Sequence, residues 1–281
     1  MADTPFQVTR GQGKAPEAPL APVDVVTDVL KNWVLGVQEY AQLCARALLN
    51  IPTAPFYFKD LIQQMDDIGV GSLPIVLLSG FFIGAVMVLQ TGAQFTRFGQ
   101  TALTGDVVSV ALVRELGPAL SGLLVAGRCA SGIASELGSM LVTEQVDAMR
   151  AMGTDPSRKL VTPRVLASVA MVPLLCALMD FIGLIGGCVA ASFSLRLNVV
   201  EFWTRAIKIL DFPDIMQGMM KPLVFGFILA TVGCYKGLTV RGGTQGVGRA
   251  TTQAVVVASV LIIVADTFLT KVALFLADKV F

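Results

Sequence analysis

Long apolar segments dominate the chain from about residue 70 onward. Each is close to the roughly 20 residues that a helix needs to cross the hydrocarbon core of a bilayer, and polar segments separate them. Five transmembrane helices are expected, over about residues 70–89, 107–126, 165–193, 215–235 and 250–277. No charged residue occurs between Asp67 and Arg97, around the first of these segments. The pattern therefore predicts an all-α integral membrane protein.

The first 55 residues follow a different pattern. Residues 1–22 contain four prolines and no apolar periodicity, which is typical of a disordered leader, and they lack the apolar region of a secretory signal peptide. Over residues 23–55, apolar side chains recur at steps of three and four, so we expect an interfacial amphipathic helix with Trp33 and Tyr40 at the headgroup level. Packing of this helix on the protein's own spans is an equally good interpretation, and both can hold. Residues 56–281 form the predicted transmembrane domain.

Composition removes several classes of function. Only 15% of the residues are charged, against about 25% in a soluble domain. There is no His, and the five Cys have no CxxC spacing, so we expect no metal site and no His-dependent catalysis. A net charge of +1 gives no basic field for nucleic acid. The chain has no GxxxxGK[ST] phosphate loop, because Gly11 to Lys14 (GQGK) lacks the spacing and the hydroxyl, and we expect it to bind no cofactor of its own.

The distribution of Lys and Arg predicts the orientation in the membrane. Basic residues gather between spans two and three and between spans four and five, and they are fewer after spans one and three. The two richer loops contain Arg128, Arg150, Arg158, Lys159, Arg164, Lys236, Arg241 and Arg249. By the positive-inside rule, the N-terminus and these loops lie in the cytoplasm and the C-terminus lies outside.

The loop between spans two and three contains a further predicted helix, over residues 135–155. A polar stripe at steps of three and four occupies one side, formed by Glu136, Ser139, Thr143, Asp147 and Arg150. Leu137, Leu141, Ala148 and Met152 fall on another side, and Glu144 falls at its edge. A connector resting on lipid explains the periodicity. A surface on which a partner protein docks explains it too, and would also provide a partner for the Glu144 carboxylate.

Six charged residues fall within or at the ends of the apolar segments. They are Arg114, Glu115, Asp180, Lys221, Asp266 and Lys271. Because a charge at a helix centre costs about 2.5–3.5 kcal/mol on insertion scales, such residues are candidates for a functional site. One balanced pairing is Lys221 with Glu115 and Arg114 with Asp266. For Asp180 and Lys271 we favour structural roles, since Lys271 is close enough to a span end to snorkel.

The spacing of small residues in span one suggests a close helix contact. Gly80 and Gly84 form a small-xxx-small pair, which permits close approach of two helices, and a dimer contact is one candidate. The large apolar side chains of the same span suit the acyl chains of a lipid, and Gln90, near its outer end, suits a headgroup or a partner outside the membrane.

An ordered set of short motifs resembles the MlaE/YrbE family of lipid-transport permeases. The motifs are 112–118 (LVRELGP), 126–128 (AGR), 136–138 (ELG), 143–149 (TEQVDAM), 152–156 (MGTDP), 163–164 (PR) and 246–252 (GVGRATT). The resemblance covers the chain from about residue 56 to the C-terminus and does not include the leader.

The resemblance implies the transmembrane subunit of an ABC transporter in the bacterial inner membrane. Members of the family move phospholipid between the inner membrane and the outer envelope and act in outer-membrane lipid asymmetry. Two copies pair, each with a cytoplasmic ATPase subunit that binds the ATP, and a periplasmic ring of MCE-domain proteins exchanges lipid with them. The 135–155 helix then corresponds to the coupling helix, with Glu144, Gln145, Asp147 and Arg150 as its ATPase-facing residues. Arg114, Glu115, Lys221, Asp266 and Gln90 are the candidates for the lipid path.

Two other classes of function stay open from the residues alone. An ion- or proton-coupled secondary transporter would use Arg114, Glu115, Lys221 and Asp266 as its relay. Such a transporter needs no ATPase dock, which distinguishes the two hypotheses. An intramembrane enzyme ranks last, because it would need Asp180 and Asp266 face to face.

Overall fold

The computed structural model describes residues 22–51 and 57–280. The chain divides into two compact units, Met1–Gln42 and Leu43–Phe281. Helix α1 (Pro22–Asn50) accounts for the described part of the first unit. The predicted leader lies outside the described residues except for its last residue, and the interfacial placement of the amphipathic helix remains a prediction.

Five candidate membrane spans are present in the described part of the chain, which confirms the predicted all-α membrane fold. They cover Phe58–Arg97, Thr101–Val142, Ser157–Ser194, Phe212–Leu238 and Gly243–Phe275. Their helices are α2 (Phe58–Ile68), α3 (Leu73–Arg97), α4 (Thr104–Ala111), α5 (Gly117–Val125), α6 (Ser131–Val142), α8 (Thr162–Ser194), α10 (Phe212–Leu238) and α11 (Gly243–Val280). All five begin before the apolar segments that predicted them, because helical hydrogen bonding continues into the polar flanks.

The second span contains two π turns, η3 (Leu112–Leu116) and η4 (Ala126–Ala130). In η3 the amide of Gly117 donates to the carbonyl of Leu112, five residues earlier. Pro118 follows directly and has no amide hydrogen to donate to the carbonyl of Arg114, four residues before it. Such π turns occur frequently at functional sites, and this one lies where Arg114 and Glu115 interrupt the apolar sequence.

Glycines bring α3 and α8 into close contact. A Cβ atom added to Gly84 would lie 1.8 Å from the carbonyl oxygen of Gly183, and one added to Gly80 would lie 2.8 Å from that of Met179. On α8, Gly186 approaches the carbonyl oxygen of Phe81 equally closely, at 2.0 Å from an added Cβ. The small-residue pair of span one therefore packs within the chain, and the suggested dimer contact at this pair is wrong.

The helix predicted over residues 135–155 is broken in two. Helix α6 ends at Val142, Glu144 adopts a left-handed backbone with φ 59°, and α7 (Gln145–Ala151) begins after it. The single polar stripe from Glu136 to Arg150 does not exist, because the break rotates α7 relative to α6. A turn at Gly153, with φ 77°, then leads into the third span.

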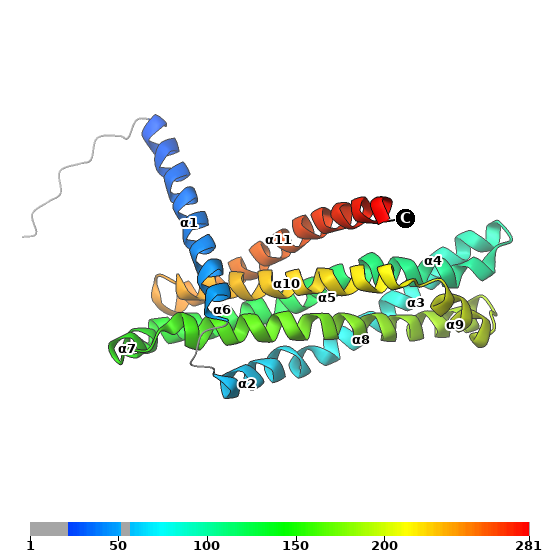
Figure 1. Cartoon of the computed structure of the whole chain (residues 1–281), viewed down its shortest axis with the longest axis horizontal. Coiled ribbons are helices and arrows are strands. Elements are labelled where there is room, and N and C mark those ends of the chain that lie inside the picture. The colour runs from blue at the N-terminus through cyan, green and yellow to red at the C-terminus, as the bar shows by residue number, and fades with distance from the viewer. Residues whose placement is uncertain (1–21, 52–56, 281) are drawn as a thin grey trace, which may run out of the picture. The chain divides into compact units, whose positions relative to one another are not determined.

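The opposite end of the second unit contains a helix that periodicity did not predict, α9 (Val199–Lys208). The Asn198 side chain caps its first turn by accepting from the amide of Val200. Phe202 and Ala206 bury one side of α9 in a core cluster with Val88, Val108, Cys188 and Ala191. Figure 1 shows α7 and α9 at opposite ends of the bundle of long helices in this unit.

Candidate functional site: an ion-pair network between three spans

The centre of the candidate site is Lys221, whose side chain is only 2% exposed. Its ammonium Nζ lies 2.6 Å from Glu115 Oε2 on the second span and 3.1 Å from Asp266 Oδ1 on the fifth. Nζ also donates to Thr270 Oγ1 at 2.9 Å. One cation of the fourth span thus joins two carboxylates from two other spans.

The same ammonium group satisfies a backbone carbonyl that the second span leaves open. Lys221 Nζ donates to the carbonyl oxygen of Arg114 at 3.0 Å. This is the carbonyl to which Pro118 has no amide hydrogen to donate. Freed backbone groups inside a membrane must find another partner, so Lys221 neutralises charge and also caps the disrupted turn.

Glu115 and Asp266 are held differently. The Glu115 carboxylate also accepts from Thr270 Oγ1 at 3.1 Å and from Gln217 Nε2 at 3.4 Å. Asp266 Oδ1 is within ion-pair distance of Lys221 but accepts no hydrogen bond from any described residue. The Lys221–Glu115 contact is therefore the stronger of the two pairs, because it combines short distance with hydrogen-bond geometry.

Arg114 does not pair with Asp266, contrary to the balanced assignment considered from the sequence. Its guanidinium binds Asp214 at the start of α10, with Nε donating to Oδ1 at 2.6 Å and the Nη2 group contacting the same oxygen. Asp214 was missed because the fourth span was predicted to begin one residue later. The spacing of Asp211 and Asp214 was the available signal, since these two carboxylates form the capping box of α10.

Two charges of the network reach the outside of the chain. The side chains of Arg114 and Glu115 are 41% and 40% exposed, whereas their partners Asp214 and Lys221 are 4% and 2% exposed. Their pairing therefore leaves polar surface within the second membrane span. Such surface needs contact with protein, water or a polar group of a ligand.

The remaining intramembrane candidates lie apart from the network. None of the contacts that join its members includes Gln90, which is exposed on α3. Lys271 is exposed near the end of α11. Asp180 accepts from Cys176 Sγ at 3.8 Å and lies against Gly117, where an added Cβ would be 1.7 Å from its Oδ1 atom. Asp180 and Asp266 take part in different sets of contacts, so nothing supports a paired-Asp enzyme.

The residues expected to face an ATPase lie on or next to α7. Glu144 is exposed rather than drawn toward an apolar side, and it is the residue that breaks the helix. Gln145, Asp147 and Arg150 are exposed as well, and Arg150 Nη1 lies 2.8 Å from Asp147 Oδ1.

The buried side of α7 differs from the prediction. It consists of Val146 and Met149, whereas Ala148 and Met152 are exposed. The break at Glu144 explains the difference, because the predicted apolar side assumed one continuous helix. The polar side chains of α7 remain exposed at this end of the unit.

Two arginines of the motifs quoted from the sequence, Arg128 and Arg164, tie this end of the bundle together. Arg164, with a side chain 5% exposed, lies 2.7 Å from Glu136 and donates to the carbonyl of Leu160. Arg128, in the second π turn, donates to the carbonyl of Asp67 at 2.7 Å and to Ser72 Oγ at 3.1 Å. Both motifs had been noted in the sequence, but their long-range partners require the fold.

Within residues 22–51 and 57–280, no group of three or more His, Cys, Asp or Glu side chains has the arrangement of a metal site. Lys221 occupies the space between the two carboxylates of the network, where a cation would otherwise be needed. The chemistry of the site is thus that of a protein cation with two protein carboxylates.

Comparison with known proteins assigns the chain to a family. The permease MlaE family matches residues 61–272. The chain is 42% identical over 240 residues, 85% of its length and 93% of the relative's, to a probable ABC transporter permease protein of Rickettsia felis. It is 35% identical over 229 residues to the chloroplastic protein TRIGALACTOSYLDIACYLGLYCEROL 1 of Arabidopsis thaliana, covering 82% of the chain and 65% of the relative. It is 34% identical over 227 residues, 80% of the chain and 87% of the relative, to the intermembrane phospholipid transport system permease protein MlaE of Haemophilus influenzae. The chain belongs to the MlaE permease family and is a multi-pass membrane permease of the ABC transporter class.

Proposed function

We propose that this chain moves phospholipid between the inner membrane and the outer envelope as the permease subunit of an ABC transporter. The observation that carries the proposal is the Arg114–Glu115 surface, a pair of half-exposed charges of opposite sign inside a membrane span. The headgroup of a phospholipid also combines charge with hydrogen-bonding oxygens. The name of the Haemophilus relative, a phospholipid transport permease, supports the same substrate class.

The network suits a lipid path for a physical reason. Lys221, through Glu115 and Asp266, fixes three spans relative to one another. The half-exposed Arg114 and Glu115 offer a guanidinium and a carboxylate to a headgroup, while apolar side chains of the spans accept the acyl chains. Gln90 is a further candidate for contact with a headgroup, at a separate place on α3.

The same exposure supports a homodimer. Hydrocarbon is a poor environment for the exposed edges of Arg114 and Glu115, because an ion there retains little of its hydration energy. A second copy that packs around this region would enclose the charges in a shared cavity. The lipid path in this proposal therefore lies between two chains.

The energy for transport comes from a partner in this proposal. A cytoplasmic ATPase subunit binds ATP and docks on α7 and the preceding turn, where Glu144, Gln145, Asp147 and Arg150 are exposed. A periplasmic MCE-domain ring receives or delivers lipid at the other side. The membrane is the bacterial inner membrane, with the N-terminus in the cytoplasm and the C-terminus in the periplasm, as the Lys and Arg distribution favours.

The decisive experiment is reconstitution of the complex in vesicles with labelled phospholipid. ATP-driven lipid movement is expected, and Glu144→Lys is expected to lower it by about tenfold or more while ATP hydrolysis continues, because a charge-assisted contact contributes about 1.5–3 kcal/mol. Asp66→Lys, which makes the same change from an acid to a lysine at an exposed position of α2, is the control and should transport normally. Normal transport by Glu144→Lys would argue against docking at this turn.

The same vesicles test the secondary-transporter hypothesis, which the lysine between two carboxylates also suits. Transport that continues without a functional ATPase and stops when the proton gradient is abolished would support that hypothesis instead. Transport that needs ATP and ignores the gradient would support the ABC mechanism.

A further inference from the structure

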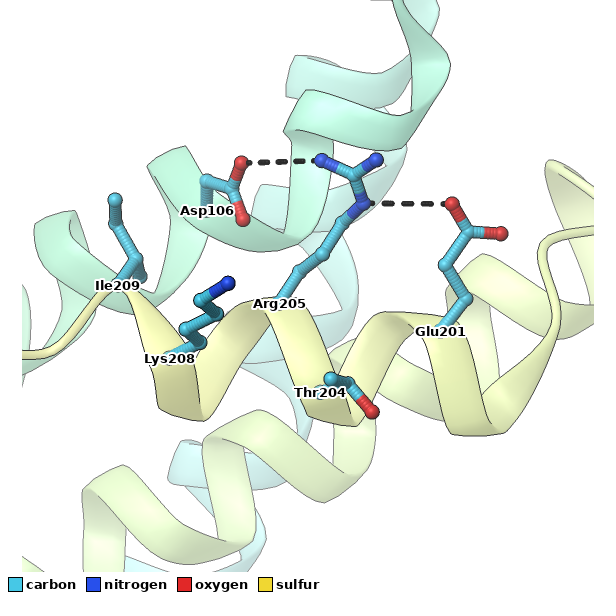
Figure 2. A pocket seen from close by; sticks show the side chains of 6 residues that line it. All are labelled: Asp106, Glu201, Thr204, Arg205, Lys208 and Ile209. Atoms are coloured by element: carbon cyan, nitrogen blue, oxygen red, sulfur yellow. Dashed lines mark hydrogen bonds and ion pairs between the residues drawn. The ribbon is translucent and has the colours of Figure 1, made fainter.

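A polar pocket lies at the end of the bundle opposite α7, between α9 and the beginning of the second span. Its volume is about 560 Å³, and it is lined by Asp106, Glu201, Thr204, Arg205, Lys208 and Ile209. Figure 2 shows Asp106 approaching from α4, while the other side chains come from α9 and from Ile209 directly after it. The pocket shares no residue with the ion-pair network of Lys221.

The charges in this pocket balance and are only loosely engaged with one another. Arg205 lies between the two carboxylates, with Nη1 3.6 Å from Asp106 Oδ2 and Nε 3.3 Å from Glu201 Oε1 (Figure 2). Both distances are long for charge-assisted hydrogen bonds. Lys208 is exposed and forms no ion pair with any residue in the described part of the chain. The pocket thus offers a cation without a partner beside two carboxylates that share one guanidinium.

Helix α9 has three distinct sides. Phe202 and Ala206 face the core. The helical spacing places the polar side, with Glu201 and Lys208, next to a side that carries Val200 and Ile207, which are 70% and 63% exposed. The helix connects the ends of two membrane spans, so we expect its exposed apolar side at the depth of the outermost acyl carbons and its polar side at the depth of the headgroups.

We infer that this pocket binds the headgroup of a zwitterionic phospholipid with a primary amine, such as phosphatidylethanolamine. Lys208 and Arg205 bind the phosphate, and Glu201 and Asp106 bind the ammonium group. The acyl chains lie along Val200 and Ile207. This site is separate from the proposed transport path, and it requires only that the chain is inserted in a membrane.

The arrangement selects against other ligands. An anionic lipid such as phosphatidylglycerol provides a phosphate for Lys208 but leaves both carboxylates beside a ligand with no positive charge. A soluble phosphate compound would make no use of the exposed Val200 and Ile207. A protein partner that covered α9 would exclude lipid from the pocket.

The test uses the full chain in phosphatidylglycerol nanodiscs that contain a small fraction of photoactivatable lipid. Two probes with the same diazirine-bearing acyl chain are compared, one with an ethanolamine headgroup and one with a glycerol headgroup. After illumination, the crosslinked peptides are mapped by mass spectrometry. The ethanolamine probe is expected to label residues 199–209 about tenfold more than the glycerol probe, a difference of roughly 1.4 kcal/mol.

Variants at exposed positions distinguish specific binding from contact with bulk lipid. Lys208→Glu and Glu201→Lys should each reduce labelling of residues 199–209 by the ethanolamine probe several-fold. Arg97→Gln, an exposed arginine outside the pocket, should leave it unchanged. Elution as a single species with unchanged helical circular dichroism establishes that each variant is folded.

Equal labelling by the two probes would overturn the inference, as would labelling that neither variant reduces. An effect of Lys208→Glu without one of Glu201→Lys would show phosphate binding alone and would also overturn it. Displacement of the probe by soluble glycerophosphoethanolamine at equal concentration would show that the acyl chains contribute nothing, and it would overturn the assignment to a lipid. Shielding of residues 199–209 from lipid by a protein in native membranes would make the surface a protein interface and would overturn the inference as well. If the unaltered chain shows no ATP-driven transport, the proposed function is refuted, whereas the expected labelling pattern is unaffected.

Discussion

Replacement of Lys221 by Met is the most informative test of the ion-pair network. Met has a similar length and retains the apolar packing of the lysine side chain, but it has no charge and no donor. The substitution leaves Glu115 and Asp266 without their shared cation and the carbonyl of Arg114 without its donor. Lys221→Met is therefore expected to destabilise the folded chain and not merely to alter its function.

The expected magnitude follows from burial. Removal of one member of a buried ion pair costs about 3–5 kcal/mol. Lys221 is 2% exposed, but Glu115 is 40% exposed and retains part of its solvation without the lysine. The lower end of the range, about 3 kcal/mol, is thus the appropriate estimate. It corresponds to a change of about two orders of magnitude in the folding equilibrium.

The assay is unfolding of the purified chain in mixed micelles by increasing SDS, monitored by circular dichroism. Lys271→Met is the matched control, since Lys271 is an exposed lysine of the last span and should cost less than about 0.5 kcal/mol. The triple variant Lys221→Met with Glu115→Gln and Asp266→Asn should regain much of the lost stability, because it leaves no uncompensated buried charge.

Two outcomes would refute this reasoning. If Lys221→Met and Lys271→Met have the same free energy of unfolding, the network contributes nothing to stability. If the triple variant is less stable than Lys221→Met alone, uncompensated charge on the two carboxylates is not the cause of the lost stability.

Two further substitutions test the close packing of α3 on α8 and the N-terminal cap of α10. Gly84→Ala should destabilise the chain by about 3 kcal/mol or more, because the new methyl group would overlap the carbonyl of Gly183. Gly132→Ala is the control: nothing lies within 4 Å of its added Cβ, so it should change the free energy of unfolding by less than about 1 kcal/mol. Equal effects of the two substitutions would contradict the close α3–α8 contact. Asp214→Leu should cost about 2–3 kcal/mol in the same SDS assay, since it removes the buried partner of Arg114 and one half of the capping box. Asp211→Asn, at an exposed position that keeps its acceptor oxygen, is the control. If Asp214→Leu loses less free energy of unfolding than this control, Arg114 does not depend on the Asp214 carboxylate.

The sequence alone predicted the membrane class, the number of spans and the residues that interrupt them. These features depend on local composition, since bilayer thickness dictates the length of an apolar helix and each charge within it is visible along the chain. The pairing of Lys221 with Glu115 was one of the balanced pairings that the few charges inside the spans allowed, and the fold selects it.

Other features depend on the rotation of helices about their axes, which a periodic pattern does not reveal. Arg114 lies within the π turn before Pro118, and its partner is Asp214 and not Asp266. The left-handed residue Glu144 falls within a stretch whose side chains fit a continuous helix, so periodicity predicted one helix where there are two.

Helix α9 shows the same division between local pattern and fold. Its ten residues are too few to be recognised as a span, and their apolar positions are divided between a core-facing side and an exposed side. Asn198 provided a local signal for its start. The pocket exists only because tertiary packing brings Asp106, almost a hundred positions earlier in the chain, beside Arg205. Local sequence thus determined which segments are helical and apolar, and tertiary packing decided which charges face one another, because side-chain direction depends on every turn that precedes it.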